Sequence, residues 1–323
     1  MRVDVHNHVM PESALRMLRE DPTYGVTLDG RRWSGGLHVD FEIVPSFVEP
    51  GPKLAELASK GLEAAVVSVA PPLFCYHLDA ELAGEPMARA VNRGLAEFCA
   101  EAPDRLRWLA TVPMQDPQRA VAVLEDAVEV GCVGVEIGTS VDGRRLDEPA
   151  FEPFWAAAER LQLPVTLHPA YCERIPALAP YYLENVLGFP FETTIAIERL
   201  IISGVLDRHP DLRIVLVHGG GYLPYQAGRL RHARAVRPEL AHAPSDPSAY
   251  RDRLYFDIVT HDPAALTYLI EWAGGDRVVM GTDLPFDMAT PEPMRLLEAA
   301  ASGPAVEAIA ERNPAALYGF PVG

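Results

Sequence analysis

The chain has 323 residues, of which 49% are hydrophobic, and its formal net charge is −17. A chain of this length can bury a large core, and the acidic balance argues against binding to nucleic acid or to anionic membrane surfaces. The four cysteines show no Cys-x-x-Cys spacing, which favours reduced thiols over disulfides, and no apolar run is long enough to span a membrane.

The first predicted strand covers residues 2–6 and leads into the motif His6-Asn7-His8. Side chains two residues apart in a strand point to the same side, so both imidazoles would project together and could share one metal ion. Two ordinary polar residues near an N-terminus would give the same pattern. The pair alone therefore does not distinguish metal ligands from ordinary polar residues. Asp4 and the histidines also interrupt any signal-peptide pattern, which makes a cytoplasmic location the default expectation.

A small β insertion is expected after this strand, over about residues 22–50, because apolar and polar residues alternate between Leu37 and Ile43. A helix over residues 52–60 follows. From there short β-branched runs alternate with amphipathic stretches rich in Ala, Leu and Glu. The further strand candidates are residues 64–70, 107–113, 133–138, 164–168, 213–218, 254–259 and 277–281.

The helical stretches between these strands often begin with a capping residue and proline, as at Asp116-Pro117 and Asp262-Pro263. Eight β-then-α units predict an α/β protein of the (β/α)₈ TIM-barrel class, with residues 1–323 as a single domain. A doubly wound open sheet is the alternative. It is less favoured because no Gly-x-Gly-x-x-Gly turn follows the first strand.

Five of the eight predicted strands deliver a histidine or an aspartate at or just after their C-terminal end. The C-terminal strand ends of a barrel form one rim, where active sites lie. The residues at these ends are His6, His8, His168, His218, His261 and Asp283. Each could separately be a hydrogen-bonded structural residue, but their shared position at one rim indicates a common role.

Three of these histidines and the aspartate, namely His6, His8, His168 and Asp283, make a plausible set of ligands for one divalent ion. Imidazole and carboxylate without thiolate suit Zn²⁺, with Mn²⁺, Fe²⁺ or Co²⁺ as alternatives. His218 would then lie beside the bound water as general acid or base, and Asp283 could share in proton transfer.

The motifs HNH, TLHPA, VHGGG and GTDLPF together resemble the amidohydrolase superfamily. Within it, the chain is most similar to the subgroup typified by α-amino-β-carboxymuconate-ε-semialdehyde decarboxylase. The match is collinear over nearly the whole chain and includes TVPMQDP (111–117), FPFETTIAI (189–197) and HPDLRIVLVHGGGYLPYQAGR (209–229).

This resemblance implies one metal ion, usually zinc, on the four residues named above, and His218 as the acid/base residue acting on metal-bound water. It also implies a homodimer in which Arg229 reaches the neighbouring active site and holds a substrate carboxylate. From the residues alone, Arg229 is a helix-surface arginine, although the guanidinium fork suits a carboxylate.

Two departures refine the expected chemistry. Other superfamily members bridge two metals with a lysine at the end of strand four, but this chain has Glu136 there and only Lys53 and Lys60 elsewhere. A lysine-bridged pair of metals is therefore excluded, and a Glu136-bridged pair is less favoured. The founding decarboxylase also binds a substrate carboxylate with an arginine in the insertion, whereas residues 36–44 contain none; Arg31 or Arg32 could substitute.

The sequence therefore predicts a metal-dependent, non-oxidative decarboxylase of an aromatic or unsaturated carboxylic acid, other than the aminocarboxymuconate semialdehyde itself. The alternative on the same site is a metal-dependent hydrolase or hydratase. A non-enzymatic metal-binding protein is less favoured because every candidate residue is present. Rim aromatic residues are expected either to line an apolar pocket or to pack loops; they are Phe74, Tyr76, Tyr181, Tyr182, Phe189 and Phe286.

Overall fold

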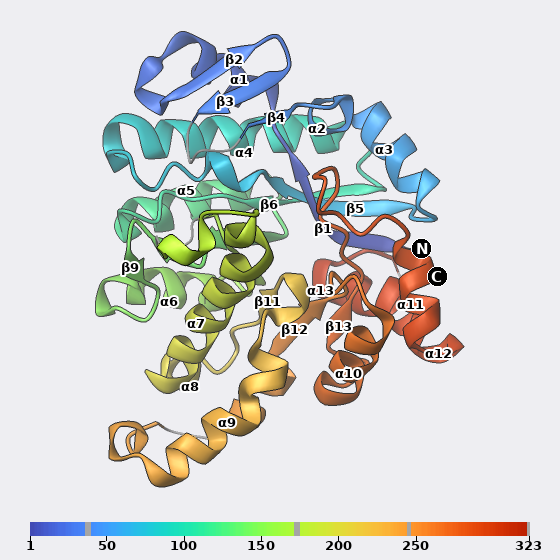
Figure 1. Cartoon of the computed structure of the whole chain (residues 1–323). Coiled ribbons are helices and arrows are strands. Elements are labelled where there is room, and N and C mark those ends of the chain that lie inside the picture. The colour runs from blue at the N-terminus through green and yellow to red at the C-terminus, as the bar shows by residue number, and fades with distance from the viewer. Residues whose placement is uncertain (36–39, 171–174, 244–246, 322–323) are drawn as a thin grey trace.

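The computed structural model describes residues 1–35, 40–170, 175–243 and 247–321. Within this part of the chain, eight parallel strands form one sheet in the order β1-β5-β6-β7-β10-β11-β12-β13 (Figure 1). The strands are β1 (Val3–Val9), β5 (Ala64–Val69), β6 (Leu106–Ala110), β7 (Gly134–Gly138), β10 (Val165–His168), β11 (Ile214–Leu216), β12 (Leu254–Asp257) and β13 (Val278–Val279).

Backbone hydrogen bonds between the last and first strand regions close the sheet. The Val5 amide donates to the Met280 carbonyl at 2.9 Å, and the His8 amide donates to the Leu284 carbonyl at 2.7 Å. Every residue of β1, β5 and β7 is buried, as expected for parallel strands that are covered on both faces. The predicted (β/α)₈ barrel is confirmed.

Strands six and eight are shorter than their apolar runs predicted. After β11, the chain leaves the sheet at Val217 and enters a tight turn over His218–Gly220, in which His218 has a left-handed φ of 55°. After β13, the Met280 amide donates to the Ile309 carbonyl at the C-terminal end of the chain instead of to a neighbouring strand. After Val217 the first run leaves its ladder, and after Val279 the second is joined to β1 only by irregular bonds, such as that from the Asp283 amide to the His6 carbonyl. Hydrophobicity alone cannot show that difference from a regular strand.

Helices surround the barrel (Figure 1). Their bounds are α1 (Glu12–Glu20), α2 (Pro45–Val48), α3 (Pro50–Ser59), α4 (Glu85–Ala100), α5 (Pro117–Glu129), α6 (Glu152–Arg160), α7 (Phe189–Ile202), α8 (Val205–Arg208), α9 (Leu223–Val236), α10 (Pro263–Ala273), α11 (Pro293–Ala300), α12 (Gly303–Glu307) and α13 (Asn313–Tyr318). The Asp-Pro starts act as predicted, since Asp116 accepts from the Gln118 amide and Asp262 from the Ala265 amide. Among the described residues, no helix combines the length and apolarity that crossing a bilayer requires.

The predicted β insertion is a three-stranded antiparallel sheet of β2 (Val26–Asp29), β3 (Arg32–Gly35) and β4 (Phe41–Glu42). Leu37 and Val39, which contributed to that prediction, lie outside the described residues. Phe41 packs against Phe286 with ring centroids 5.7 Å apart, and Phe286 in turn lies edge-on to His8 at 5.2 Å. The insertion therefore packs against the rim beside the first-strand histidines.

His209 shows what a histidine outside the rim does in this fold. It precedes β11, and its two ring nitrogens lie 3.0 Å from a Glu159 carboxylate oxygen and 2.9 Å from a Glu152 carboxylate oxygen, both on α6. The hydrogen bond from Arg208, together with that from His209, lowers the pKa of Glu152. Burial opposes the same shift at Glu159, but the Asp211 amide and His209 outweigh it and lower the pKa of Glu159.

Replacing this residue, His209→Ala, is expected to cost about 1–2 kcal/mol in the free energy of unfolding at pH 7, because the carboxylates of Glu152 and Glu159 lose their imidazole partner. Carboxyl pKa values that are lower in the folded chain stabilise it above their usual value of 4.5, and that stabilisation is lost as the pH falls. The gap between variant and wild type should therefore narrow from pH 7 to pH 3.5 in urea titrations. A gap that stays constant over this range would contradict the assignment; exposed His242→Ala is the control.

Candidate metal centre and active site

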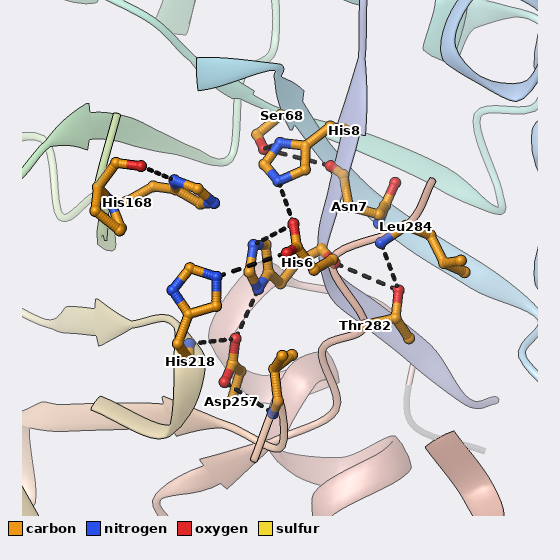
Figure 2. Close-up of polar contacts among 12 residues, drawn as sticks. His6, Asn7, His8, Ser68, His168, His218, Asp257, Thr282 and Leu284 are labelled. Atoms are coloured by element: carbon orange, nitrogen blue, oxygen red, sulfur yellow. Dashed lines mark hydrogen bonds and ion pairs between the residues drawn. The ribbon is translucent and has the colours of Figure 1, made fainter. Parts of the chain in front are cut away.

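The four predicted ligands come together at the C-terminal rim of the barrel. His6 and His8 project from β1 and His168 ends β10 (Figure 2). Asp283 follows β13, and all four residues are buried. One donor atom from each lies within 4.8 Å of the others. Asp283 Oδ1 is 3.0 Å from His8 Nε2 and 3.4 Å from His6 Nε2. Three imidazoles and one carboxylate at this spacing suit a single divalent ion.

The hydrogen bonds of the three imidazoles leave their Nε2 atoms available as ligands. In each ring, Nδ1 faces an oxygen acceptor. The acceptors are Asp257 Oδ2 for His6 at 2.6 Å, the Val69 carbonyl for His8 at 3.1 Å and the Pro169 carbonyl for His168 at 2.9 Å. Because a carbonyl only accepts, Nδ1 carries the proton and the lone pair stays on Nε2. The Nε2 atoms of His6 and His168 are buried without a hydrogen-bond partner among the described residues, as a metal site requires.

The pKa directions agree with this arrangement. Burial lowers the pKa of His8 to about 4, and burial with the neighbouring imidazoles lowers the pKa of His168 well below its usual value. Burial opposes ionisation of Asp283, but the charge of His6 and a hydrogen bond from His218 outweigh it and lower the pKa of Asp283 well below its usual range. Burial also opposes the charge of His6, yet Asp283 and Asp257 raise the pKa of His6.

His218 lies beside this group without belonging to it. Its ring centroid is 5.4 Å from that of His6 and 5.2 Å from that of His168, and its Nε2 is 3.6 Å from Asp283 Oδ2. Its side chain is 16% exposed, whereas the His6 and His8 side chains are almost fully enclosed. The structure thus places His218 beside the four convergent residues, with part of its side chain accessible to solvent.

The glycines after His218 are required by close packing. Gly221 has a φ of 63°, and a Cβ there would lie 2.2 Å from the Pro190 carbonyl oxygen. A Cβ on Gly220 would lie 2.6 Å from the Phe256 ring. Only glycine fits these positions, so the VHGGG motif fixes how the backbone passes the site.

Sequence reasoning missed Asp257. This carboxylate ends β12, is fully buried, and contacts His6 Nδ1 and the backbone amide of His218 (Figure 2). The signal was present, because Asp257 interrupts the otherwise apolar run LYFDIV, and a buried charge needs specific partners.

A cavity of about 540 Å³ opens beside His218 and Asp283, between α9, α10 and residues 185–190. Its aromatic lining residues are Phe189, Tyr222, Tyr225 and Tyr268, and its polar ones include Asn185, Thr260 and His261. Among the described residues that line it, none is arginine or lysine. The cavity therefore suits a flat, largely apolar molecule whose reacting end meets His218.

The other residues considered from sequence take different places. Of the six rim aromatics, only Phe189 lines this cavity; Phe74 and Tyr76 stack on each other in the core, with centroids 5.3 Å apart. Arg31 pairs with Glu49 on the surface at 3.1 Å, and neither it nor Arg32 lines the cavity. The insertion arginines therefore do not reach the cavity.

Two further charged residues have distinct surroundings. Glu136 is buried in β7 outside the four-residue group, and burial raises its pKa to about 8. Lys53 is buried beneath β1, where its Nζ donates to the His8 carbonyl oxygen at 3.0 Å. Neither is placed to bridge two metal ions within the group described above.

Arg229 lies on α9, which extends away from the barrel (Figure 1), and its side chain is exposed. It does not line the cavity of its own chain, although Tyr225, one turn earlier on the same helix, does. A role at a substrate therefore requires a second copy of the chain.

Comparisons with known proteins agree with this site. The family model described as Amidohydrolase matches residues 3–320. The 2-amino-3-carboxymuconate-6-semialdehyde decarboxylase of Dictyostelium discoideum is 30% identical over 308 residues, covering 92% of this chain and 85% of that protein. The gamma-resorcylate decarboxylase of Rhodococcus jostii (strain RHA1) is 36% identical over 222 residues, covering 62% and 67%.

Among solved structures, 5-carboxyvanillate decarboxylase from Sphingomonas paucimobilis superposes with a TM-score of 0.84 at 25% identity, covering 99% of each chain. The family match spans the strands that carry all four convergent residues and His218. The chain belongs to the amidohydrolase family.

Proposed function

We propose that this chain is a metal-dependent, non-oxidative decarboxylase of an aromatic or unsaturated carboxylic acid. The observation that carries the proposal is the convergence of three imidazole Nε2 atoms and Asp283 beside an accessible His218 at an aromatic-lined cavity. The decarboxylase activity named for the relatives supports the choice of reaction.

In this proposal His6, His8, His168 and Asp283 hold one divalent ion. Zn²⁺ is the first choice for an N₃O donor set without thiolate, and Mn²⁺, Fe²⁺ and Co²⁺ are the alternatives. When bound, the ion supplies Lewis-acid stabilisation of negative charge on substrate oxygens and a fixed point for orientation.

The reaction replaces the carboxylate on a substrate carbon with a proton. His218 Nε2 delivers that proton to the carboxylate-bearing carbon of an enol, dienol or phenol. The electrons of the breaking carbon–carbon bond return to the conjugated system as carbon dioxide leaves. Asp283 Oδ2, 3.6 Å from His218 Nε2, keeps the imidazole oriented. The apolar cavity walls limit water around the developing charge.

The lining favours a substrate with a single ring or diene over one with several carboxylates, because the described residues of the cavity supply no cation. Hydroxybenzoates fit this description, and aminocarboxymuconate semialdehyde fits it less well.

The experiment that tests the reaction is a product assay. Metal-loaded protein is incubated with a panel of hydroxybenzoates and muconates, and released carbon dioxide plus bicarbonate is measured alongside the organic product. Stoichiometric carbon dioxide with a protonated product supports the proposal. Turnover of lactone, amide or alkene substrates without carbon dioxide would replace it with the hydrolase or hydratase alternative.

We also propose that the protein works as a homodimer in which Arg229 of one copy binds the substrate carboxylate in the other. Helix α9 carries three arginines in a chain of net charge −17, so it can face an acidic surface of a second copy. Tyr225 and Val236 on this helix are 79% and 58% exposed, which suits a contact surface.

Arg229→Ala is expected to lower kcat/KM by about 10–100-fold, the value of one charge-assisted hydrogen bond to a carboxylate, without changing metal content. Mixing it with His218→Ala tests whether the arginine acts across the interface. Random reassortment into isologous dimers restores one intact site in each hybrid, or about a quarter of wild-type activity. Failure to regain activity in verified hybrids would show that Arg229 does not act on the neighbouring site.

A further inference from the structure

Asp257 makes four polar contacts from a fully buried position at the end of β12. Its Oδ2 lies 2.6 Å from His6 Nδ1 and accepts from the His218 amide at 3.0 Å. Its Oδ1 accepts from the amides of Gly219 at 2.7 Å and Val259 at 3.0 Å. One carboxylate therefore contacts both an imidazole of the four-residue group and the backbone of His218.

We propose that Asp257 is a positioning residue that couples the metal centre to His218, by fixing the tautomer of His6 and the turn that presents the His218 imidazole. The inference extends the proposed function to a residue on a strand that supplies none of the proposed ligands. Its first half concerns metal binding alone and stands whatever reaction the site performs.

The first half follows from the His6 hydrogen bond. A carboxylate only accepts, so it holds the His6 proton on Nδ1 and leaves the Nε2 lone pair directed at the other three donor atoms. Three backbone amides, those of His218, Gly219 and Val259, also donate to this carboxylate, so both of its oxygens serve as acceptors.

The second half follows from the backbone contacts. His218 has a φ of 55° and Gly219 a φ of 62°, and a non-glycine residue in this left-handed region is strained. The Asp257 carboxylate accepts from both amides of this turn, which offsets the strain. Without that acceptor, the turn loses the hydrogen bonds that hold the His218 ring centroid 5.4 Å from that of His6.

Packing holds the carboxylate and His6 against each other. They pack across Gly281, where a Cβ would lie 2.8 Å from Asp257 Cβ and 2.9 Å from His6 Cβ. A side chain at this position would push the two apart, which provides an independent way to break the contact.

The decisive variant is Asp257→Asn, which keeps the shape and removes one acceptor. All four neighbours donate, so the amide NH₂ necessarily faces donors. His6 can relieve the conflict by moving its proton to Nε2, which removes the lone pair that a metal needs, whereas backbone amides cannot adjust. We expect the Kd for Co²⁺ to rise about 10–100-fold, and the visible absorption spectrum at saturating Co²⁺ to change with the ligand set.

Substrate turnover gives a second readout. At saturating metal, Asp257→Asn should still show a lower kcat with KM little changed, because the His218 turn has lost an acceptor. Gly281→Ala should also raise the Kd for Co²⁺. If Asp257→Asn does not fold, Gly281→Ala is the variant that tests the proposal. Leu254→Ala, a buried truncation on the same strand, is the matched control: it should lower thermal stability and leave the Co²⁺ spectrum unchanged.

A wild-type Kd and spectrum in a folded Asp257→Asn protein, or in Gly281→Ala if only that variant folds, would overturn the proposal. Because the Co²⁺ Kd and the absorption spectrum are measured without substrate, they are independent of the reaction. If the variants weaken Co²⁺ binding but the wild-type protein releases no carbon dioxide from any acid, the proposed function fails and the coupling role of Asp257 stands.

Discussion

His218→Ala is expected to lower kcat/KM by about 10²–10⁴-fold while leaving the bound metal in place, which is the range that a positioned general acid contributes. The reason is geometric. His218 Nε2 is 3.6 Å from Asp283 Oδ2, and the ring faces the cavity without joining the group of convergent donor atoms. Steady-state kinetics and metal analysis on the same preparation measure both effects.

The matched control is His261→Ala. His261 lines the same cavity from the loop after β12 and also has a left-handed backbone, with φ of 58°. Replacing it tests whether loss of any imidazole from the cavity slows turnover, and we expect kcat/KM to change only a few fold. Equal losses of kcat/KM in both variants would mean that the shape of the cavity, and not proton delivery by His218, determines the rate. Unchanged turnover in His218→Ala would remove this residue from the mechanism.

The barrel and its rim were predictable because short strand-like runs alternate regularly with amphipathic helical stretches along the chain. Buried parallel strands are apolar runs such as AAVVSV, or valines interleaved with polar residues, as in VDVHNHV. Amphipathic helices separate the strands, and some of them have Asp-Pro starts, as α5 does. Once eight such units are counted, topology places every strand end at one rim. His168 and Asp283, 115 residues apart, could therefore be paired with His6 and His8 before any distance was known.

The contacts between strands were not predictable in this way. Asp257 ends β12 but lies two residues before the end of the predicted strand, residues 254–259, so a rule that reads only the end of the predicted run passes over it. The short β13 depends on a backbone bond to Ile309 from the distant C-terminal segment, which no local pattern encodes. Arg229 is exposed on its own chain, and the role proposed for it depends on the surface of a second copy, which a single sequence does not place.

His168→Ala is expected to abolish metal-dependent turnover, by about 10³-fold or more, with little loss of stability in the metal-free protein. His168 Nδ1 contacts only the adjacent Pro169 carbonyl, and its Nε2 is buried without a partner among the described residues. Burial and three neighbouring imidazoles already disfavour its charged form and lower its pKa. Removing it therefore deletes an unsatisfied buried group, which offsets part of the cost of the cavity.

Metal removal gives the complementary result in the wild-type protein. Chelation should abolish turnover, and one equivalent of Zn²⁺ per chain should restore it. A ligand that binds only the folded state stabilises it by about 2.7 kcal/mol at one hundred times its Kd, so Zn²⁺ should raise the melting temperature of wild type but not of His168→Ala. Exposed His242→Ala should respond as wild type does. Retained turnover after verified metal removal would reject the metal-dependent mechanism, because His218 and Asp283 alone would then suffice.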